Sequence, residues 1–194
     1  MRVVAFNGSP RTHGNTAAII KLVFSELEKQ GIETELVQVG GILKQGCTGC
    51  NYCHKNKSAG CVIANDPLNE WIEKIAAADG IILGSPVYFN DVTSEMKAFI
   101  DRAGYVARAN DRMYKHKIGA AVVAVRRNGA VHALDTMFHF LSSMQLFIVG
   151  GSNNVLANRI GDVEKDFEGL QNMQTLGINM ALLLKALNAY HPQD

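Results

Sequence analysis

The sequence predicts an α/β protein in which a parallel sheet carries helices on both faces. Five short segments typical of strands alternate with five amphipathic segments typical of helices along the 194 residues. Strands separated by helices form parallel sheets, because each helical crossover returns the chain to the same edge. The length and the even composition favour one domain over residues 1–194.

The alternation begins with a buried strand. Residues 2–7 are mostly apolar and β-branched, which indicates a strand in the interior of a sheet. Residues 17–29 place apolar side chains at helical spacing, and Asn15 or Thr16 is the expected cap. Residues 33–39 alternate polar and apolar side chains, as a strand at a sheet edge does.

A long loop over residues 43–66 then interrupts the alternation. Loops of this length inside compact domains are usually functional, so we expect an insertion with a role of its own. Pro67 begins the second helix, because proline fits the first turn. Residues 81–83 form a short buried strand, and a third helix covers residues 93–106.

The second half of the chain ends in an apolar helix. Residues 118–125 are a continuous apolar strand, residues 131–143 a fourth helix and residues 146–149 the last expected strand. Residues 163–190 are helical, with a possible break at Gly177. The aliphatic part of this helix is apolar on nearly all sides, which predicts burial in the core or in a subunit interface.

The composition excludes several classes of function. Lys and Arg (19) nearly balance Asp and Glu (18), and no basic stripe is present, so we expect no nucleic-acid partner. No apolar run approaches the roughly 18 residues of a membrane span, and the chain begins without a signal-peptide pattern. We therefore expect a soluble, cytoplasmic protein with no membrane contact.

The loop between the first strand and the first helix is suited to a phosphate. A strand that feeds a helix through a small polar loop presents free backbone N–H groups to an anion. Neither G-x-G-x-x-G nor G-K-[ST] is present, which lowers the odds of a dinucleotide or of ATP. An ordinary turn with a helix cap remains the alternative. The polar side chains of this loop are Ser9, Arg11, Thr12, Asn15 and Thr16.

Two further loops lie at the carboxyl ends of expected strands, where open α/β sheets bind ligands. Residues 84–90 include Pro86, Tyr88 and Phe89, which are placed to flank a planar ring or to cover the core. Residues 126–129 offer two arginines, an amide and a glycine, a pattern that also fits a solvated turn.

The four cysteines lie close together, in the pattern Cys47-x2-Cys50-x2-Cys53-x7-Cys61. Three thiolates two residues apart with a fourth nearby are typical of iron–sulfur ligation. Zinc is the second interpretation, since its sites usually use two separated pairs, and a disulfide is the third. The fourth interpretation is a segment that has the cysteines but binds no metal.

The chain resembles the flavodoxin-like NADPH-dependent FMN reductases, and within them the iron–sulfur flavoproteins. The cysteine segment carries part of this resemblance. The other motifs are Asn7-Gly8-Ser9-Pro10-Arg11 with Gly14-Asn15-Thr16, Gly84-Ser85-Pro86-Val87-Tyr88-Phe89 and, more weakly, Lys97-Ala98-Phe99-Ile100-Asp101-Arg102.

The resemblance implies a flavodoxin-like three-layer αβα sandwich with a five-stranded parallel sheet in the order 2-1-3-4-5, and non-covalently bound FMN. It also implies a homodimer or homotetramer. The FMN phosphate is expected on Ser9, Arg11, Asn15 and Thr16. The ring is expected against Pro86, Val87, Tyr88, Phe89 and Asn90, with Arg127, Asn128 and Gly129 closing over it. A [4Fe–4S] cluster is expected on Cys47, Cys50, Cys53 and Cys61.

The expected function is an oxidoreductase that passes electrons from NAD(P)H, or from a ferredoxin-like donor, through FMN to an unidentified acceptor. The chemistry belongs to the flavin, and no side-chain acid or base is expected to be catalytic. Asp101 and Arg102 are expected to form ion pairs at a helix end. An electron carrier without its own small-molecule substrate, or a zinc-binding regulatory protein, are the alternatives.

Overall fold

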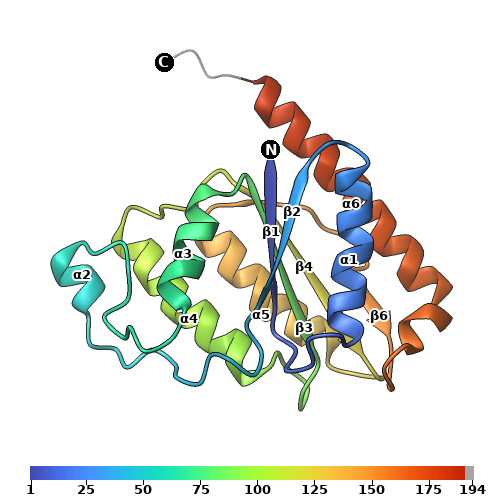
Figure 1. Cartoon of the computed structure of the whole chain (residues 1–194), viewed down its shortest axis with the longest axis horizontal. Coiled ribbons are helices and arrows are strands. Elements are labelled where there is room, and N and C mark those ends of the chain that lie inside the picture. The colour runs from blue at the N-terminus through green and yellow to red at the C-terminus, as the bar shows by residue number, and fades with distance from the viewer. Residues whose placement is uncertain (191–194) are drawn as a thin grey trace.

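The computed structural model describes residues 1–190 and shows three layers, with a parallel sheet between two groups of helices (Figure 1). The sheet order is β2-β1-β3-β4-β5, which confirms the expected flavodoxin-like order. The strands are β1 (Arg2–Asn7), β2 (Glu33–Gln38), β3 (Gly80–Pro86), β4 (Ile118–Val125), β5 (Phe147–Ile148) and β6 (Asn154–Leu156). The helices are α1 (Asn15–Glu28), α2 (Tyr52–Asn56), α3 (Leu68–Ala77), α4 (Ser94–Ala109), α5 (Ala130–Ser143), the 3₁₀ helix η1 (Asp162–Lys165) and α6 (Phe167–Ala189).

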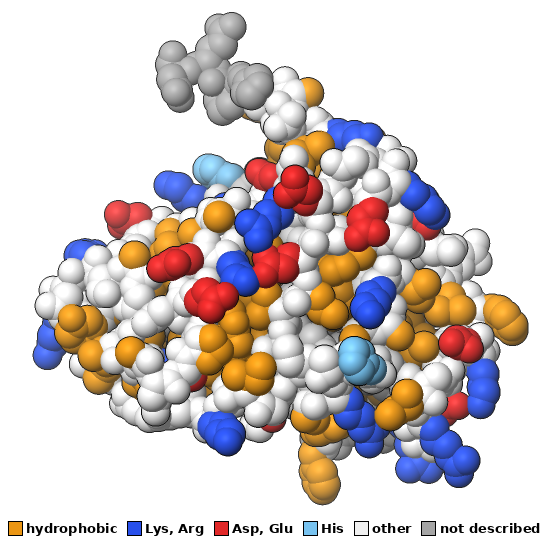
Figure 2. Space-filling model, in the orientation of Figure 1, with side chains coloured by type: hydrophobic (Ala, Val, Ile, Leu, Met, Phe, Trp, Pro, Cys, Tyr) orange, Lys and Arg blue, Asp and Glu red, His pale blue; other side chains and the backbone are white. Residues whose placement is uncertain are grey.

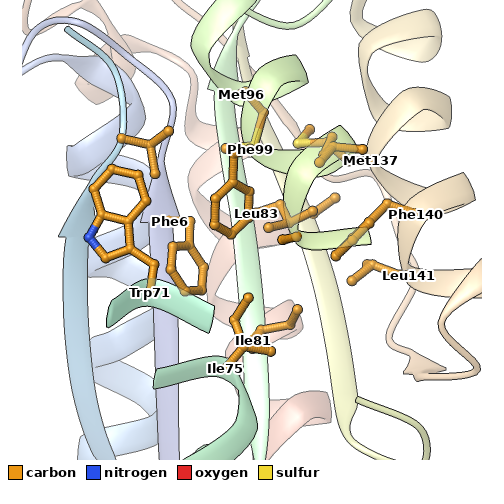
Figure 3. Close-up of a cluster of buried hydrophobic side chains, with 14 of the residues drawn as sticks. Phe6, Trp71, Ile75, Ile81, Leu83, Met96, Phe99, Met137, Phe140 and Leu141 are labelled. Carbon is orange, nitrogen blue, oxygen red and sulfur yellow. The ribbon is translucent and has the colours of Figure 1, made fainter. Parts of the chain in front are cut away.

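The central strands are buried on both faces, as their continuous apolar sequences predict. Successive side chains of β1 point to opposite faces, so Val4 and Phe6 join the core under α3, α4 and α5. Phe6 stacks on Phe99 of α4 with ring centroids 4.6 Å apart, and Trp71 of α3 lies beside them (Figure 3). This aromatic group fixes α4 against the sheet.

The opposite face of the sheet is covered by α1 and α6, which lie side by side (Figure 1). The expected break at Gly177 is wrong, because α6 continues through it from Phe167 to Ala189. A Cβ at Gly177 would come within 2.8 Å of the Val23 carbonyl oxygen and of Glu26 Cβ on α1. Gly177 therefore permits the close approach of the two helices.

The last strand position is divided between two short strands. β5 pairs with the first residues of β4, and β6 pairs with residues 123–125 at its other end. The expected strand over residues 146–149 corresponds to β5, whereas β6 was not expected. The second strand matters because it carries the chain to the edge of the sheet where β1 and β3 also end.

Helix α6 keeps part of its apolar surface exposed. Met180 and Leu184 are buried, but Ile178 and Leu182 are 55% and 68% exposed. One side of this helix is therefore in the core, and the exposed apolar side leaves the alternative of a subunit interface as a prediction. Among residues 1–190, no helix combines the length and the apolar character needed to cross a membrane.

Candidate functional site

A network of amides holds the β1–α1 loop (residues 8–14) in shape. The Asn7 side chain accepts a hydrogen bond from the Ser9 backbone N–H at 3.1 Å and donates one to Gln38 Oε1 at 2.8 Å. Gln38 in turn donates to the carbonyl oxygens of Ser9 and Gly40, at 2.6 and 2.7 Å. Two neighbouring strands therefore position the start of the loop.

Backbone and side-chain contacts also join this loop to the end of β3 and to the β3–α4 loop (residues 87–93). The Gly8 N–H donates to the Gly84 carbonyl at 2.7 Å. The Thr93 hydroxyl, which caps α4, donates to the Gly8 carbonyl at 2.7 Å. The Thr93 backbone N–H donates to the Ser85 hydroxyl at 3.1 Å. The two loops therefore form one unit at the carboxyl edge of the sheet.

A cavity of about 220 Å³ lies between these two loops, the end of β4 and the segment that follows β6. Seven of the residues predicted to bind the cofactor line it: Ser9, Arg11, Asn15, Thr16, Pro86, Val87 and Tyr88. The other lining residues are Ala124, Arg126, Ala157 and Asn158. The structure thus brings the two predicted loops around one hollow.

The inner end of the cavity suits an anion. Thr16 is 1% exposed, and its hydroxyl has no hydrogen-bond partner within the protein. It lies in the first turn of α1, where backbone N–H groups and the helix dipole favour negative charge. Arg11 and Arg126 add positive charge, and Lys and Arg side chains gather near the start of α1 and the end of β6 (Figure 2).

Asn15 lines the cavity, and its side-chain amide also makes two hydrogen bonds to the loop after β6. Its Nδ2 donates to the Arg159 carbonyl at 2.9 Å, and its Oδ1 accepts from the Gly161 N–H at 3.0 Å. Both ends of the amide are therefore used to hold the loop after β6. This loop also includes Ala157 and Asn158, which sequence reasoning missed because β6 itself was missed.

The remaining predicted cofactor residues lie outside the cavity lining. Tyr88 and Asp91 exchange two backbone hydrogen bonds, at 2.9 and 3.2 Å, which leaves Phe89 and Asn90 at the tip of a tight turn. Both have positive φ, +50° and +69°, as a type I′ turn requires. Phe89 is fully exposed as a result.

In the β4–α5 loop (residues 126–129) only Arg126 lines the cavity, whereas Arg127, Asn128 and Gly129 do not. Gly129 has a φ of +90° and lies against Asn90, where a Cβ would come within 2.6 Å of the Asn90 Cα. Gly129 therefore packs directly against Asn90 at the tip of the tight turn.

The four cysteines line a second, smaller hollow on the outer side of α4, at the left of Figure 1. Cys47 and Cys50 are exposed, Cys53 and Cys61 are partly buried, and all four are free thiols. Left-handed backbone at Gly49 and the short helix α2 turn the segment around the hollow. The Gly49 N–H donates to Cys47 Sγ at 3.4 Å, and burial raises the pKa of Cys53.

Thiolates are ligands of both iron–sulfur clusters and zinc. Among residues 1–190, no three His, Cys, Asp or Glu side chains lie close enough to chelate one metal ion. In a four-iron cluster each thiolate binds a different iron, so the sulfurs stand farther apart than around one zinc. Val62, Ile63 and Val106 line the same hollow as the four cysteines.

A buried ion pair supports the cysteine segment (residues 43–66). Arg102 is 1% exposed and pairs with Asp66, with Nη1 2.5 Å from Oδ2. Burial acts to lower the pKa of Arg102, but the neighbouring Asp66 carboxylate and Cys61 thiol raise it overall. Both residues form ion pairs as expected, but in the middle of α4 and not at its end: Asp101 pairs with Lys97 on the surface, and Arg102 pairs with Asp66 in the interior.

Comparison with known proteins decides the family. Residues 1–159 match the family model described as NADPH-dependent FMN reductase. The chain belongs to the NADPH-dependent FMN reductase family. An iron–sulfur flavoprotein of Methanocaldococcus jannaschii is 33% identical over 96% of this chain and 99% of its own length. One of Methanosarcina thermophila is 29% identical over 89% of this chain and 90% of its own.

Solved structures agree with this FMN reductase fold. A flavodoxin from the domain Archaea superposes with a TM-score of 0.64 at 17% identity, covering 95% of this chain and 99% of its own. At that identity the likeness concerns the fold. Family membership supports flavin-based electron transfer and FMN as the cofactor.

Proposed function

We propose that the protein binds FMN in the cavity between residues 8–16 and 86–88 and transfers electrons from NAD(P)H, or from a ferredoxin-like protein, to an acceptor. The observation that carries this proposal is the buried Thr16 hydroxyl without a partner at the inner end of that cavity. Bound FMN supplies hydride acceptance and single-electron transfer.

The β1–α1 loop provides the binding energy for the phosphate. Thr16 and Ser9 offer hydroxyl groups, the first turn of α1 offers N–H groups, and Arg11 and Arg126 offer positive charge. Hydrogen bonds to a charged group contribute about 1.5–3 kcal/mol each. Asn15 acts indirectly by holding the loop after β6.

The β3–α4 loop provides a wall for the ring. Pro86, Val87 and Tyr88 present apolar surface to the cavity, which excludes water from one side of a planar ligand. Phe89 and Asn90 lie at the rim, supported by Gly129. From there they, together with Arg127 and Asn128, can contact the outer edge of the ring or an incoming donor.

We propose further that Cys47, Cys50, Cys53 and Cys61 hold a [4Fe–4S] cluster. Their shared hollow and the names of the relatives support this assignment. The exposed Ile178 and Leu182 support a homodimer or homotetramer. Exposed cysteines at the surface also favour the second candidate function, an electron carrier that receives electrons from another protein.

The test is an anaerobic visible spectrum of the purified protein before and after NADPH, combined with iron, sulfide and zinc analysis. Flavin bands that bleach with NADPH are the expected result. Bleaching by reduced ferredoxin but not by NADH or NADPH would select the carrier. A protein that retains no FMN under any condition contradicts the proposal, and zinc in place of iron would favour a zinc-binding regulatory protein.

A further inference from the structure

One arginine joins the two ends of the cysteine segment, Gln45 and Ile63, which form its neck. Arg102 Nη1 donates to the Gln45 carbonyl at 3.3 Å, and its Nη2 donates to the Ile63 carbonyl at 2.8 Å. Gln45 lies two residues before the first cysteine and Ile63 two residues after the last. The same guanidinium binds both oxygens of Asp66, at 2.5 and 3.2 Å. The two ends of the segment are therefore joined through a single side chain of α4.

The remaining donor of Arg102 has no partner. Its Nε is buried and makes no hydrogen bond within the protein. Arg102 also lines the hollow that contains the four cysteines. A buried N–H without an acceptor costs roughly 1–3 kcal/mol, so an acceptor on the cysteine side of the guanidinium would satisfy it.

Cys61 lies close to Arg102 in the same hollow, and a residue of α3 holds it in place. Its backbone N–H donates to Asn69 Oδ1 at 2.7 Å, and its carbonyl accepts from Asn69 Nδ2 at 2.9 Å. Asn69 lies in α3, so two helices fix the position of this one cysteine. Cys47 and Cys50, in contrast, lie in exposed loop.

We propose that Arg102 is the positioning residue of the cysteine segment, and that its unpartnered Nε–H donates to sulfur at the Cys61 corner of the bound cluster. The inference rests on the proposed function, because it requires that the cysteines hold a cluster. Arg102 then sets the reduction potential of the cluster as well as the shape of the site.

The charges of Arg102 and Asp66 determine in which direction each shifts the reduction potential of the cluster. Hydrogen bonds to the sulfurs and net charge are among the factors that set cluster potentials. Reduction adds negative charge to the cluster, so a nearby cation and an N–H donor stabilise the reduced form and raise the potential. Asp66 offsets part of the positive charge of Arg102. Removing Arg102 should therefore lower the potential, and neutralising Asp66 should raise it.

The experiment compares R102Q, D66N and the control R108Q in the full chain. Arg108 lies exposed on the same helix, so R108Q removes the same group at a distance from the neck. Each protein is reconstituted anaerobically, assayed for iron, sulfide and FMN, and titrated with a reductant while the cluster is followed by electron paramagnetic resonance.

We expect R102Q to shift the reduction equilibrium at least tenfold toward the oxidised cluster, about 59 mV for one electron. D66N should shift it the opposite way, and R108Q should leave it unchanged. A purely structural clamp predicts lower iron content without opposed shifts of the potential.

Equal potentials in R102Q and R108Q overturn the inference and leave the proposed function intact. If R102Q retains no iron, D66N decides, because it keeps the guanidinium in place; a D66N potential equal to that of R108Q then overturns it. A wild-type protein without iron and sulfide overturns the proposed cluster and this inference together.

Discussion

Substitution of Gly40 by alanine tests whether the β1–α1 loop holds the phosphate. A Cβ at Gly40 would approach the carbonyl groups of Ser9 and Gly8 more closely than the 3.0 Å limit of real Cβ contacts. These are backbone atoms, so the loop must move. The Gln38 hydrogen bonds to Ser9 and Gly40 would be strained by that movement.

The expected loss of FMN affinity is large. Overpacking of this kind costs about 1–3 kcal/mol of stability. A displaced loop that loses two hydrogen bonds to the phosphate loses about 3–6 kcal/mol of binding energy. At 1.4 kcal/mol for each factor of ten, G40A should bind FMN roughly 10²- to 10⁴-fold more weakly.

The assay is a titration of the apoprotein with FMN and with riboflavin, followed by quenching of flavin fluorescence. Riboflavin has the same ring but no phosphate, so G40A should affect it far less. G150A is the matched control, because nothing lies within 4 Å of a Cβ at Gly150. The reasoning is refuted if G40A and G150A bind FMN equally, or if G40A weakens riboflavin binding as much as FMN binding.

Three further predictions follow from the same edge of the sheet and from the cysteine segment. T16V should lower FMN affinity about tenfold, because one hydrogen bond to a charged group is lost. The melting temperature of the apoprotein should not fall, because the substitution removes a buried hydroxyl that has no partner. Unchanged FMN affinity contradicts the phosphate assignment. G129A should cost roughly 1–3 kcal/mol of stability, because it forces a side chain with a φ of +90° against Asn90. It should weaken FMN binding and riboflavin binding equally in the same titrations, because Asn90 is on the ring side of the site. A loss of FMN binding alone contradicts this placement. In protein without metal, iodoacetamide at pH 8 should modify Cys53 more slowly than the exposed Cys47, since burial raises the pKa of Cys53 and the thiolate is the nucleophile. Peptide mass mapping over time checks this, and modification of Cys53 at least as fast as that of Cys47 contradicts it.

Strand and helix order could be predicted because the core repeats a simple pattern. β1 and β4 are continuous apolar runs, and α1 and α4 show apolar side chains at helical spacing. β6 could not be predicted, because three residues are too few to show a period. The break expected at Gly177 failed for another reason: glycine is unfavourable in an isolated helix, but here it allows contact with α1.

The site was predictable where chemistry is local and not where it depends on tertiary contacts. Residues of the β1–α1 loop and Pro86, Val87 and Tyr88 follow strands, so the sheet order alone brings them together. The amide of Asn15 bonds to residues more than 140 positions away, which no local pattern reveals. The sequence contained one signal for the buried Arg102. It lies in the apolar stripe of α4 that includes Phe99 and Val106, where a cation needs a buried partner.

Helix α4 connects the two candidate cofactor sites. Thr93 at its start binds Gly8 and Ser85 in the cavity loops, and Arg102 holds the neck of the cysteine segment. The two residues are nine positions apart, about 14 Å along a helix axis. Between them, Phe99 stacks on Phe6 of β1 and fixes the helix to the sheet (Figure 3). Because the same helix positions both sites, their separation within one chain is set by the fold.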